Sequence, residues 1–461
     1  MKILLITYDN DSRIAFFPLG LAYIASACRE AGHEVKIYNQ GVFHWPEEHL
    51  TAFLDDQHFD VVGLGIVGGY YEYAKCSKIS KAINLSKNRP FYVLGGHGPS
   101  PIPEFFLKKT GADAVVIGEG EATIVELLDC LESNRNLSQV SGLAYMLNGK
   151  FRQNSHRELI KDINSIAFPA WDLFPMEHHV LFSYANTQPT ERCMRLVAGR
   201  GCKFKCNFCY RMDKGLRLRS SQSIVEEIKL LKTLHQINYF MFVDELLMNS
   251  IERVTELCNR FINDCPGIHW SCNGRLNYAK PEVLSLMKKS GCVFVNYGIE
   301  SLDDETLRIM GKNLTVKQII VGIENTLVAG ISPGFNVIFG NIGETAEILQ
   351  KGVEFLLKYD DHTQLRNIRP VTPYPGSPLY YYAIEEGLLN GPEDFYNRNI
   401  NSDLLTVNFT KMSDKEVHQL LYEANKILID RYFSGQLAKS IESARKLYLE
   451  GDVSFRGFRH A

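Results

Sequence analysis

Several features that define other protein classes are missing from this chain of 461 residues. No run of about 18 consecutive apolar residues occurs, so we expect no transmembrane helix. Neither sign of charge dominates, because the chain has 50 Lys and Arg residues and 53 Asp and Glu residues. This balance argues against a nucleic acid or a membrane surface as a partner held by bulk electrostatics. With 45% hydrophobic residues and no repeat or low-complexity segment, the sequence predicts a folded protein with a large core.

Two common catalytic motifs are absent, and so is a glycine-rich nucleotide-binding motif after the first predicted strand. No GxGxxG follows the first predicted strand, which argues against a nicotinamide or flavin Rossmann site. Neither HExxH nor the ordered residues of a serine hydrolase are found. The amino-terminal segment MKILLITYDNDSR has an apolar run only from Ile3 to Ile6, and acidic residues follow. We therefore predict a first β-strand rather than a secretory signal, and a cytoplasmic protein.

The first 135 residues alternate short apolar runs with amphipathic stretches. Strands are predicted at residues 2–7, 34–38, 61–66, 91–94 and 114–117, and helices include residues 19–31 and 71–85. Alternation of this kind predicts a parallel sheet with crossover helices, hence an α/β fold.

Glycines gather where three of these strands end. The three sets include Gly63 and Gly65, then Gly95 and Gly96, and finally Gly118 and Gly120. Ligands of open α/β sheets bind beyond the carboxyl ends of the strands, where glycine allows close approach to the backbone. Turn formation alone would explain one such pair, whereas three sets favour a bound ligand.

Three further regions follow this domain of residues 1–135. Residues 136–190 are predicted to form a connector, which includes a hairpin at Asn148-Gly149 and an irregular segment around residues 168–175 that packs on a neighbouring domain. Residues 191–385 contain six strand–helix units and predict a partial (β/α)6 barrel, with strands at residues 194–198, 239–243, 269–272, 294–297, 334–339 and 364–371. Residues 386–461 form a carboxyl-terminal helical segment, in which Ser413 and Glu416 predict a capping box.

The strongest chemical signal is a cysteine cluster in the segment GRGCKFKCNFCY. Cys202, Cys206 and Cys209 are spaced CxxxCxxC after a predicted strand. Thiolates are soft ligands that suit zinc or an iron–sulfur cluster. A structural zinc site usually needs a fourth protein ligand, and the other cysteines form no CxxC partner. We therefore favour a cubic cluster with one open iron, with a zinc knuckle as the alternative.

The cysteine spacing, with Phe208 before the last cysteine, resembles the signature of the radical S-adenosylmethionine (SAM) enzymes. The resemblance implies a [4Fe–4S] cluster on the three cysteines and SAM on the fourth iron. It also implies reductive cleavage of SAM to a 5′-deoxyadenosyl radical. Later segments resemble the family in the same order: FVDE at 242–245, WSCNGRLN at 270–277, GIES at 298–301, FGNIGET at 339–345 and TPYPGSPLY at 372–380. By this resemblance the SAM-binding residues are Phe208, Asp244, Glu245, Arg275, Glu300 and Ser301.

The first domain resembles the flavodoxin-like, Rossmann-like cobalamin-binding domain that precedes the barrel in the B12-dependent branch of this family. The matching segments are PLGLA at 18–22, DVVGL at 60–64, LGGH at 94–97 and DAVVIGEGE at 113–121. By this resemblance the cobalamin-binding residues are Gly63, Gly65, Tyr70, Gly95, Gly96, His97, Gly118, Glu119 and Gly120.

One departure from the family pattern concerns the cobalt ligand. Domains that ligate cobalt with histidine carry DxHxxG after the first strand, and here residues 9–13 read DNDSR. Cobalamin is still implied, but without a histidine at that point. By position, either Tyr70 or Tyr71 could cover the lower face of the cofactor, and a packing role for these rings is at least an equal alternative.

The resemblance implies a cobalamin-dependent radical SAM enzyme that methylates an unactivated carbon of a small molecule. Two alternatives remain open: a cyclase or rearrangement enzyme with the same cofactors, and a radical SAM enzyme whose first domain does not bind cobalamin. The family also implies an electron donor such as flavodoxin or ferredoxin. Nucleic acid is not expected as a partner, since the helical tail differs from a small basic β-barrel.

Overall fold

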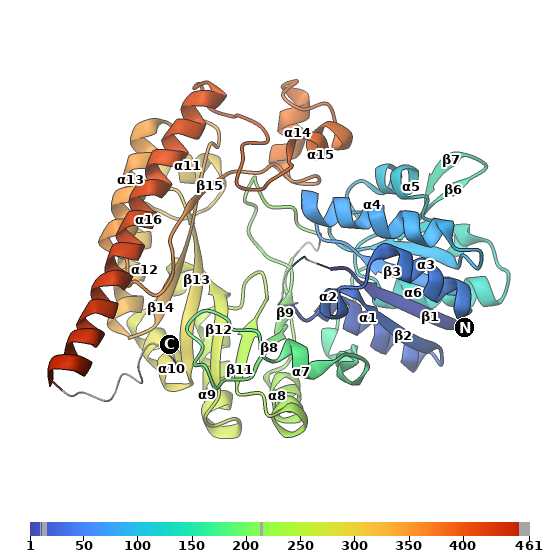
Figure 1. The fold of residues 1–461 in the computed structure, drawn as a ribbon, viewed down its shortest axis with the longest axis horizontal. Coiled ribbons are helices and arrows are strands. Elements are labelled where there is room, and N and C mark those ends of the chain that lie inside the picture. The colour runs from blue at the N-terminus through green and yellow to red at the C-terminus, as the bar shows by residue number, and fades with distance from the viewer. Residues whose placement is uncertain (10, 12–15, 213–214, 451–461) are drawn as a thin grey trace.

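The computed structural model describes residues 1–9, 11, 16–212 and 215–450. Figure 1 shows two α/β units side by side, with the first unit in blue and the second in green to orange. The carboxyl-terminal helices extend over both units. No helix among the described residues is both long enough and apolar enough to cross a membrane.

The first unit is built on a sheet with the strand order β2-β1-β3-β4-β5-β6-β7. Its parallel strands are β1 (Lys2–Thr7), β2 (Glu34–Asn39), β3 (Val61–Gly65), β4 (Phe91–Gly95) and β5 (Ala114–Val116). All five strands predicted from the sequence are confirmed, in the expected flavodoxin-like order. Ile3 to Ile6 are at most 2% exposed. Both faces of β1 are therefore covered, as is typical of a central parallel strand.

Helices cover both faces of this sheet. One face carries α1 (Leu19–Glu30) and α6 (Glu121–Glu132). The other face carries α3 (Glu47–Asp56), α4 (Tyr70–Leu85) and α5 (Pro103–Thr110), and the short α2 (Gln40–Phe43) follows β2. The unit is thus a doubly wound α/β domain, whose ligand edge lies at the carboxyl ends of its strands.

The predicted hairpin is confirmed and extends the first sheet. It consists of β6 (Leu143–Leu147) and β7 (Lys150–Gln153), and β6 pairs antiparallel with β5. Asn148 and Gly149 both have positive φ, 49° and 75°, as a two-residue primed turn requires. The start of the predicted connector therefore closes the edge of the first sheet beyond β5.

The rest of the connector packs against α1. It contains η2 (Ile163–Ser165), η3 (Trp171–Leu173) and α7 (Met176–His179), whereas η1 (Leu137–Gln139) precedes the hairpin and contacts α6. The N–H of Ala170 donates to the carbonyl of Ala22 at 3.1 Å, and the Ser26 hydroxyl donates to the Phe168 carbonyl at 2.5 Å. Trp171 is buried in a core shared with the second unit. The irregular segment thus joins the two units, as its composition predicted.

The second unit is a six-stranded parallel sheet with the order β15-β14-β13-β12-β11-β8. Its strands are β8 (Cys193–Leu196), β11 (Tyr239–Phe242), β12 (His269–Gly274), β13 (Cys292–Glu300), β14 (Ser332–Phe339) and β15 (Ile368–Pro370). The intervening helices are α8 (Ser221–His235), α9 (Ile251–Asp264), η4 (Leu276–Tyr278), α10 (Pro281–Lys289), α11 (Asp304–Ile309), α12 (Val316–Val328) and α13 (Ala346–Lys358). A separate ribbon of β9 (Gly199–Arg200) and β10 (Arg217–Leu218) flanks the cysteine loop. All six predicted strands of the partial barrel are present.

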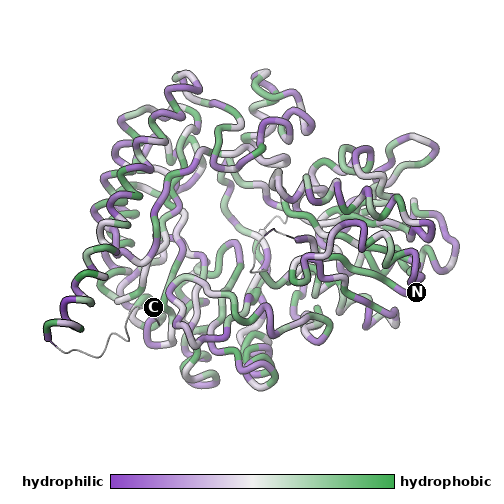
Figure 2. The backbone as a smooth tube through the Cα atoms, in the orientation of Figure 1, coloured by the Kyte–Doolittle hydropathy of each residue, from purple (hydrophilic) through white to green (hydrophobic). Residues whose placement is uncertain are grey.

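The carboxyl-terminal helices contact both units. They are α14 (Pro378–Glu385), α15 (Pro392–Arg398), α16 (Asp414–Arg445) and the π-helical turn η5 (Lys446–Glu450). The ring of Tyr396 in α15 stacks on Tyr73 of the first unit, with 4.2 Å between centroids. Asn425 of α16 exchanges two hydrogen bonds with the backbone of Ile368 and so covers the free edge of β15. The capping box of Ser413 and Glu416 is confirmed at the start of α16, and hydrophilic and hydrophobic residues alternate along that helix in Figure 2.

Candidate active site

The cysteine loop lies between β9 and β10 and is held from two sides. The N–H of Asn207 donates to the Met310 carbonyl at 2.9 Å, and the Asn207 carbonyl accepts from the N–H of Leu379 at 2.8 Å. Gly311 approaches the loop so closely that a Cβ there would lie 2.9 Å from the Lys205 carbonyl oxygen. The turn after α11 and the start of α14 therefore fix the path of the loop.

The three thiols differ in their surroundings. Cys206 is buried, Cys202 is half-buried and Cys209 is exposed. A hydrogen bond from the Cys209 thiol, followed by the positive charges of Lys312 and Arg275, lowers the pKa of Cys206 to about 6. Burial instead raises the pKa of Cys202. Positive charge next to a thiol favours the thiolate, which is the form that ligates metal.

This donor set fits an iron–sulfur cluster by its chemistry. Within the described residues, no three His, Cys, Asp or Glu side chains are gathered closely enough to form a complete metal site. The three cysteines nonetheless share one loop, and the cationic side chains of Lys312 and Arg275 act on Cys206. Soft thiolates on a loop beside fixed positive charge suit a cluster that carries net negative charge.

Arg275 and Glu300 form a buried network beside the loop. Arg275 follows β12, donates to the Lys312 carbonyl and places its guanidinium 3.4 Å from the ring centroid of Phe204. Lys312 pairs with the Glu300 carboxylate at 2.7 Å. Glu300 ends β13 with φ of 68°, where the pairing with β14 is irregular. A left-handed conformation at a non-glycine residue is a strained feature that is typical of functional sites.

Asp244 and Glu245 follow β11 and have different environments. Both carboxylate oxygens of Asp244 accept from the N–H of Ala198, at 2.9 and 3.0 Å, and burial raises the pKa of this carboxyl to about 7. Asp244 thus holds the end of β8, the strand that leads into the cysteine loop. Glu245 is exposed, and its charge acts on Cys202. Of these two predicted SAM contacts, Asp244 is buried and Glu245 is exposed.

The last two predicted SAM contacts also lie at this end of the barrel. Ser301 follows Glu300 and is buried. Phe208, which precedes Cys209 in the loop, is half-buried, and its ring centroid lies 6.0 Å from the ammonium of Lys312. The structure thus brings together the carboxyl ends of three neighbouring strands and the cysteine loop. The contacts of these side chains with SAM remain predictions.

The glycines of the first unit divide into two groups. Three are required by packing, because an added Cβ would lie 2.8 Å from Leu5 at Gly63, 2.5 Å from the Ile66 carbonyl at Gly96 and 2.7 Å from Ile24 at Gly120. The other three, Gly65, Gly95 and Gly118, would meet nothing closer than 3.8 Å. The second group leaves space at the carboxyl edge of the sheet, and there we expect a ligand to approach the backbone.

His97 connects this edge to the cysteine loop. Its ring lies 6.3 Å from that of Tyr210, the residue directly after Cys209. His97 is exposed, yet the surrounding protein lowers the pKa of its imidazole by desolvation. The carboxyl edge of the first unit therefore lies beside the cysteine loop of the second.

Tyr70 and Glu119 are two other predicted cobalamin contacts. Tyr70 is the first residue of α4, and its side chain lies outside the described part of the structure. Glu119 is buried, and its two carboxylate oxygens accept from Arg200 and Arg217, both at 2.7 Å. Glu119 thus joins the two units, and its contact with cobalamin remains a prediction.

Sequence reasoning missed the roles of Arg200 and Lys312. Arg200 lies two residues before Cys202, in the same motif, and that position was an available signal. Lys312 stands in no motif that was recognised, and its pairing with Glu300 emerges only from the fold.

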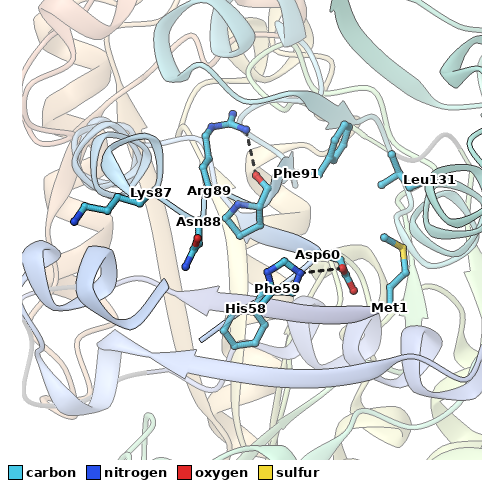
Figure 3. Close-up of a pocket in the computed structure, with 10 residues that line it drawn as sticks. Met1, His58, Phe59, Asp60, Lys87, Asn88, Arg89, Phe91 and Leu131 are labelled. Atoms are coloured by element: carbon cyan, nitrogen blue, oxygen red, sulfur yellow. Dashed lines mark hydrogen bonds and ion pairs between the residues drawn. The ribbon is translucent and has the colours of Figure 1, made fainter. Parts of the chain in front are cut away.

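A separate pocket of about 430 Å³ lies at the opposite, amino-terminal edge of the first sheet (Figure 3). Its lining includes Met1, His58, Asp60, Lys87 and Arg89. Arg89 is already paired with Asp113 at 2.7 Å. None of the predicted site residues lines this pocket, so it is separate from the candidate active site.

Comparisons with known proteins agree with this geometry. The model of the radical SAM superfamily matches residues 196–356, and that of the B12 binding domain matches residues 6–128. An uncharacterized methyltransferase of Pyrococcus horikoshii is 32% identical over 401 residues, which cover 84% of each chain. The anaerobic magnesium-protoporphyrin IX monomethyl ester cyclase of Rubrivivax gelatinosus is 26% identical over 79% of this chain and 65% of its own length.

Solved structures show the same fold. The radical SAM methyltransferase TsrM of Kitasatospora setae, solved with cobalamin and a [4Fe–4S] cluster, aligns with a TM-score of 0.68. The match covers 85% of this chain and 76% of that one at 18% identity. With both domains matched in order and a relative aligned along most of its length, the chain belongs to the radical SAM enzymes that carry an amino-terminal cobalamin-binding domain.

Proposed function

We propose that this enzyme methylates an unactivated carbon of a small-molecule substrate. The contact between His97 and Tyr210 carries the proposal, because it brings the carboxyl edge of the cobalamin-binding domain against the cysteine loop of the barrel. When bound, the [4Fe–4S] cluster, SAM and cobalamin supply a hydrogen-abstracting 5′-deoxyadenosyl radical and a transferable methyl group. A substrate bound between the carboxyl edge of the first unit and the cysteine loop has access to both.

The chain's own residues bind and orient these groups. Cys202, Cys206 and Cys209 are the cluster ligands of this proposal, and Lys312 and Arg275 offset the negative charge beside them. For SAM we propose contacts with Phe208, Asp244, Glu245, Arg275, Glu300 and Ser301. For cobalamin we propose contacts with Gly63, Gly65, Tyr70, Gly95, Gly96, His97, Gly118, Glu119 and Gly120. A radical reaction needs no general base for hydrogen abstraction, and protection from water and oxygen falls to the packed units.

The remaining expectations are part of the same proposal. We place the enzyme in the cytoplasm, with flavodoxin or ferredoxin as the electron donor. Its domains are residues 1–135, a connector of residues 136–190, the barrel of residues 191–385 and the helical segment of residues 386–461. In support, α16 packs on the barrel edge, and the connector packs on α1.

Product analysis of the anaerobically reconstituted protein tests the proposal. The protein is incubated with SAM and a strong reductant, with and without cobalamin, and the products are measured by mass spectrometry. We expect 5′-deoxyadenosine in both samples and S-adenosylhomocysteine only with cobalamin. A Cys206→Ala variant is the negative control, and Cys265→Ala, at the end of α9, removes a thiol outside the loop. Absence of 5′-deoxyadenosine from the wild-type protein would contradict the radical SAM chemistry.

Cyclisation or rearrangement is the second candidate, favoured by the similarity to the Rubrivivax gelatinosus cyclase. The same experiment separates the two. If cobalamin binds but yields no S-adenosylhomocysteine, a reaction without methyl transfer is supported. If cobalamin does not bind, the first domain has another role.

A further inference from the structure

The two faces of the barrel sheet are occupied very differently. Residues that point toward the outer helices are fully buried and include Met194, Phe240, Phe242, Trp270, Val295 and Tyr297. Successive residues of a strand point to opposite faces, so their neighbours line the inner face. On that inner face Arg195, Met241, Asn273 and Asn296 are only half-buried, and Asn336 is exposed although it lies inside β14. The inner face of the sheet is therefore open in its middle.

This inner face is polar as well as open. The amide of Asn273 donates to the Asp244 carbonyl at 2.9 Å, and its oxygen accepts from Asn296 at 3.2 Å. The strand register pairs Asn336 of β14 with Gly298 of β13, which lies two residues beyond Asn296. These bonds use only part of the donors and acceptors of each amide, and the rest are left for water or a ligand. Their presence indicates a compartment that takes a polar molecule.

Arg195 is the charged group of this compartment and has no described counter-ion. It lies in β8, the barrel strand next to the cysteine loop, and no described residue accepts a hydrogen bond from it. Its guanidinium sits 4.7 Å from the ring centroid of Phe16. Burial lowers the pKa of Arg195, and its Nε is buried without a partner. Since arginine remains protonated in proteins, this is a desolvated positive charge with no anion among the described residues.

Two fully buried arginines have the acidic partner that Arg195 lacks among the described residues. Arg219 is paired with Glu227 at 2.5 Å, and Arg366 with Asp361 at 2.8 Å. The acid nearest to Arg195 in sequence, Glu191, is instead engaged with His269. An aromatic face contributes about 0.5–2 kcal/mol to a cation, less than the cost of desolvating it. Packing against Phe16 alone therefore does not account for the position of Arg195.

We propose that Arg195 binds an oxyanion of the substrate, a carboxylate or a phosphate, in the polar compartment on the inner face of the barrel. This inference rests on the proposed function, because it names the substrate class of the same site. Arginine presents a planar fork that matches both anions, and the amides lie on the same face of the sheet. The substrate is thus an acid or a phosphate ester whose anionic group is anchored on β8.

Chemical modification of the full-length protein tests this assignment. The protein is treated with phenylglyoxal, and the labelling of each arginine is followed by peptide mass spectrometry. Separate samples contain inorganic phosphate, acetate or neither probe. We expect Arg195 to be labelled and the probe to protect it in a saturable manner. Arg308, which is exposed and paired with Glu305 on the surface, is the control that should be labelled equally in all samples.

The two probes distinguish the sources of the anion. Stronger protection by phosphate supports a phosphate ester, and stronger protection by acetate supports a carboxylic acid. If neither probe protects Arg195, or if Arg195 is not labelled, the assignment is wrong. A thermal-shift titration of Arg195→Gln with the protecting probe checks the result, because the probe should bind about tenfold or more weakly. Arg195→Lys, which keeps the charge but loses the fork, should recover part of the affinity.

Failure of this inference is separable from failure of the proposed function. The wild-type protein is assayed separately for cluster assembly, cobalamin binding and release of 5′-deoxyadenosine without substrate. If those properties persist and the anion effect is absent, the substrate assignment fails alone. If the wild-type protein releases no 5′-deoxyadenosine, the proposed function fails whatever the labelling result.

Discussion

Replacing Glu119 by Gln should loosen the cysteine loop although Glu119 belongs to the other unit. Its carboxylate is 5% exposed and accepts hydrogen bonds from Arg200 and Arg217 at 2.7 Å and from the N–H of Ile160 at 2.9 Å. Arg200 also pairs with Glu121 at 2.5 Å. Burial works to raise the pKa of Glu119, but the two guanidinium groups and the N–H together lower it. The carboxylate is therefore charged at neutral pH, and its stabilisation is lost only as the pH falls through this lowered pKa.

The size of the effect follows from the two charged hydrogen bonds. A hydrogen bond to a charged group contributes about 1.5–3 kcal/mol, and a neutral one about 0.5–1.5 kcal/mol. Glu119→Gln keeps the shape and removes the charge, so each of the two bonds loses about 1 kcal/mol. A total of about 2 kcal/mol corresponds to about a 30-fold change in a local opening equilibrium. Removing the side chain altogether would cost more, because it leaves two buried cations near each other.

Amide hydrogen exchange measures this opening directly. Peptides that cover residues 199–209 should exchange about 30-fold faster in Glu119→Gln, whereas peptides from α9 should be unchanged. Glu104→Gln removes an exposed pair with Lys108 and serves as the control without effect. Wild-type exchange in the cysteine loop of Glu119→Gln would refute the idea that this ion-pair network holds the loop.

Three further predictions concern the cofactors and the pH dependence of stability. Cys206→Ala should abolish the visible absorbance of the reconstituted cluster, whereas Cys265→Ala should retain it; a retained cluster in the first variant would contradict the ligand assignment. Gly118→Ala and Gly149→Ala place a Cβ in open space at similar φ, 79° and 75°, so each should cost about 1–2 kcal/mol of stability. Titration should show weaker cobalamin binding for Gly118→Ala alone, and equal affinities would argue against the glycine edge. Burial raises the pKa of Asp244 to about 7, so the folded protein binds the extra proton and its unfolding free energy should fall as pH rises from about 4 to 7, by at most about 1.4 kcal/mol per unit. Asp244→Asn should lack this component in denaturant titrations across that range, and an unchanged pH profile would show that Asp244 does not titrate there.

Much of the fold could be predicted because its signals are local. Each strand of the first sheet is a short apolar run followed by turn residues, and the Asn148-Gly149 turn fixes the hairpin. The ends of the elements were harder to predict: β13 extends to Glu300 through an irregular pairing that has no sequence signal. Strand positions thus follow from composition, whereas their ends depend on neighbouring strands.

The cysteine loop was predictable because its three cysteines, the proposed cluster ligands, lie within eight residues of one another. The surrounding charges were not, because their partners are distant in the sequence. Glu119 and Arg200 are 81 residues apart and belong to different units, so no periodicity or spacing pairs them. The sequence assigned Glu119 to the cofactor by resemblance, and the structure adds its ion pairs. Arg195 was also hidden, since an arginine within a strand becomes informative only when its neighbours and its missing partner are known.

Polar and aromatic contacts hold the two units together. Residues adjacent to the proposed cofactor positions also form the interface: His97 faces Tyr210, and Glu119 pairs with Arg200. The stacking of Tyr73 on Tyr396 adds an apolar contact at the carboxyl-terminal helices. A shift of either unit would break buried ion pairs and change the separation between the glycine edge and the cysteine loop. The interface therefore holds the separation between the two proposed cofactor sites, which a reaction that uses both on one substrate requires.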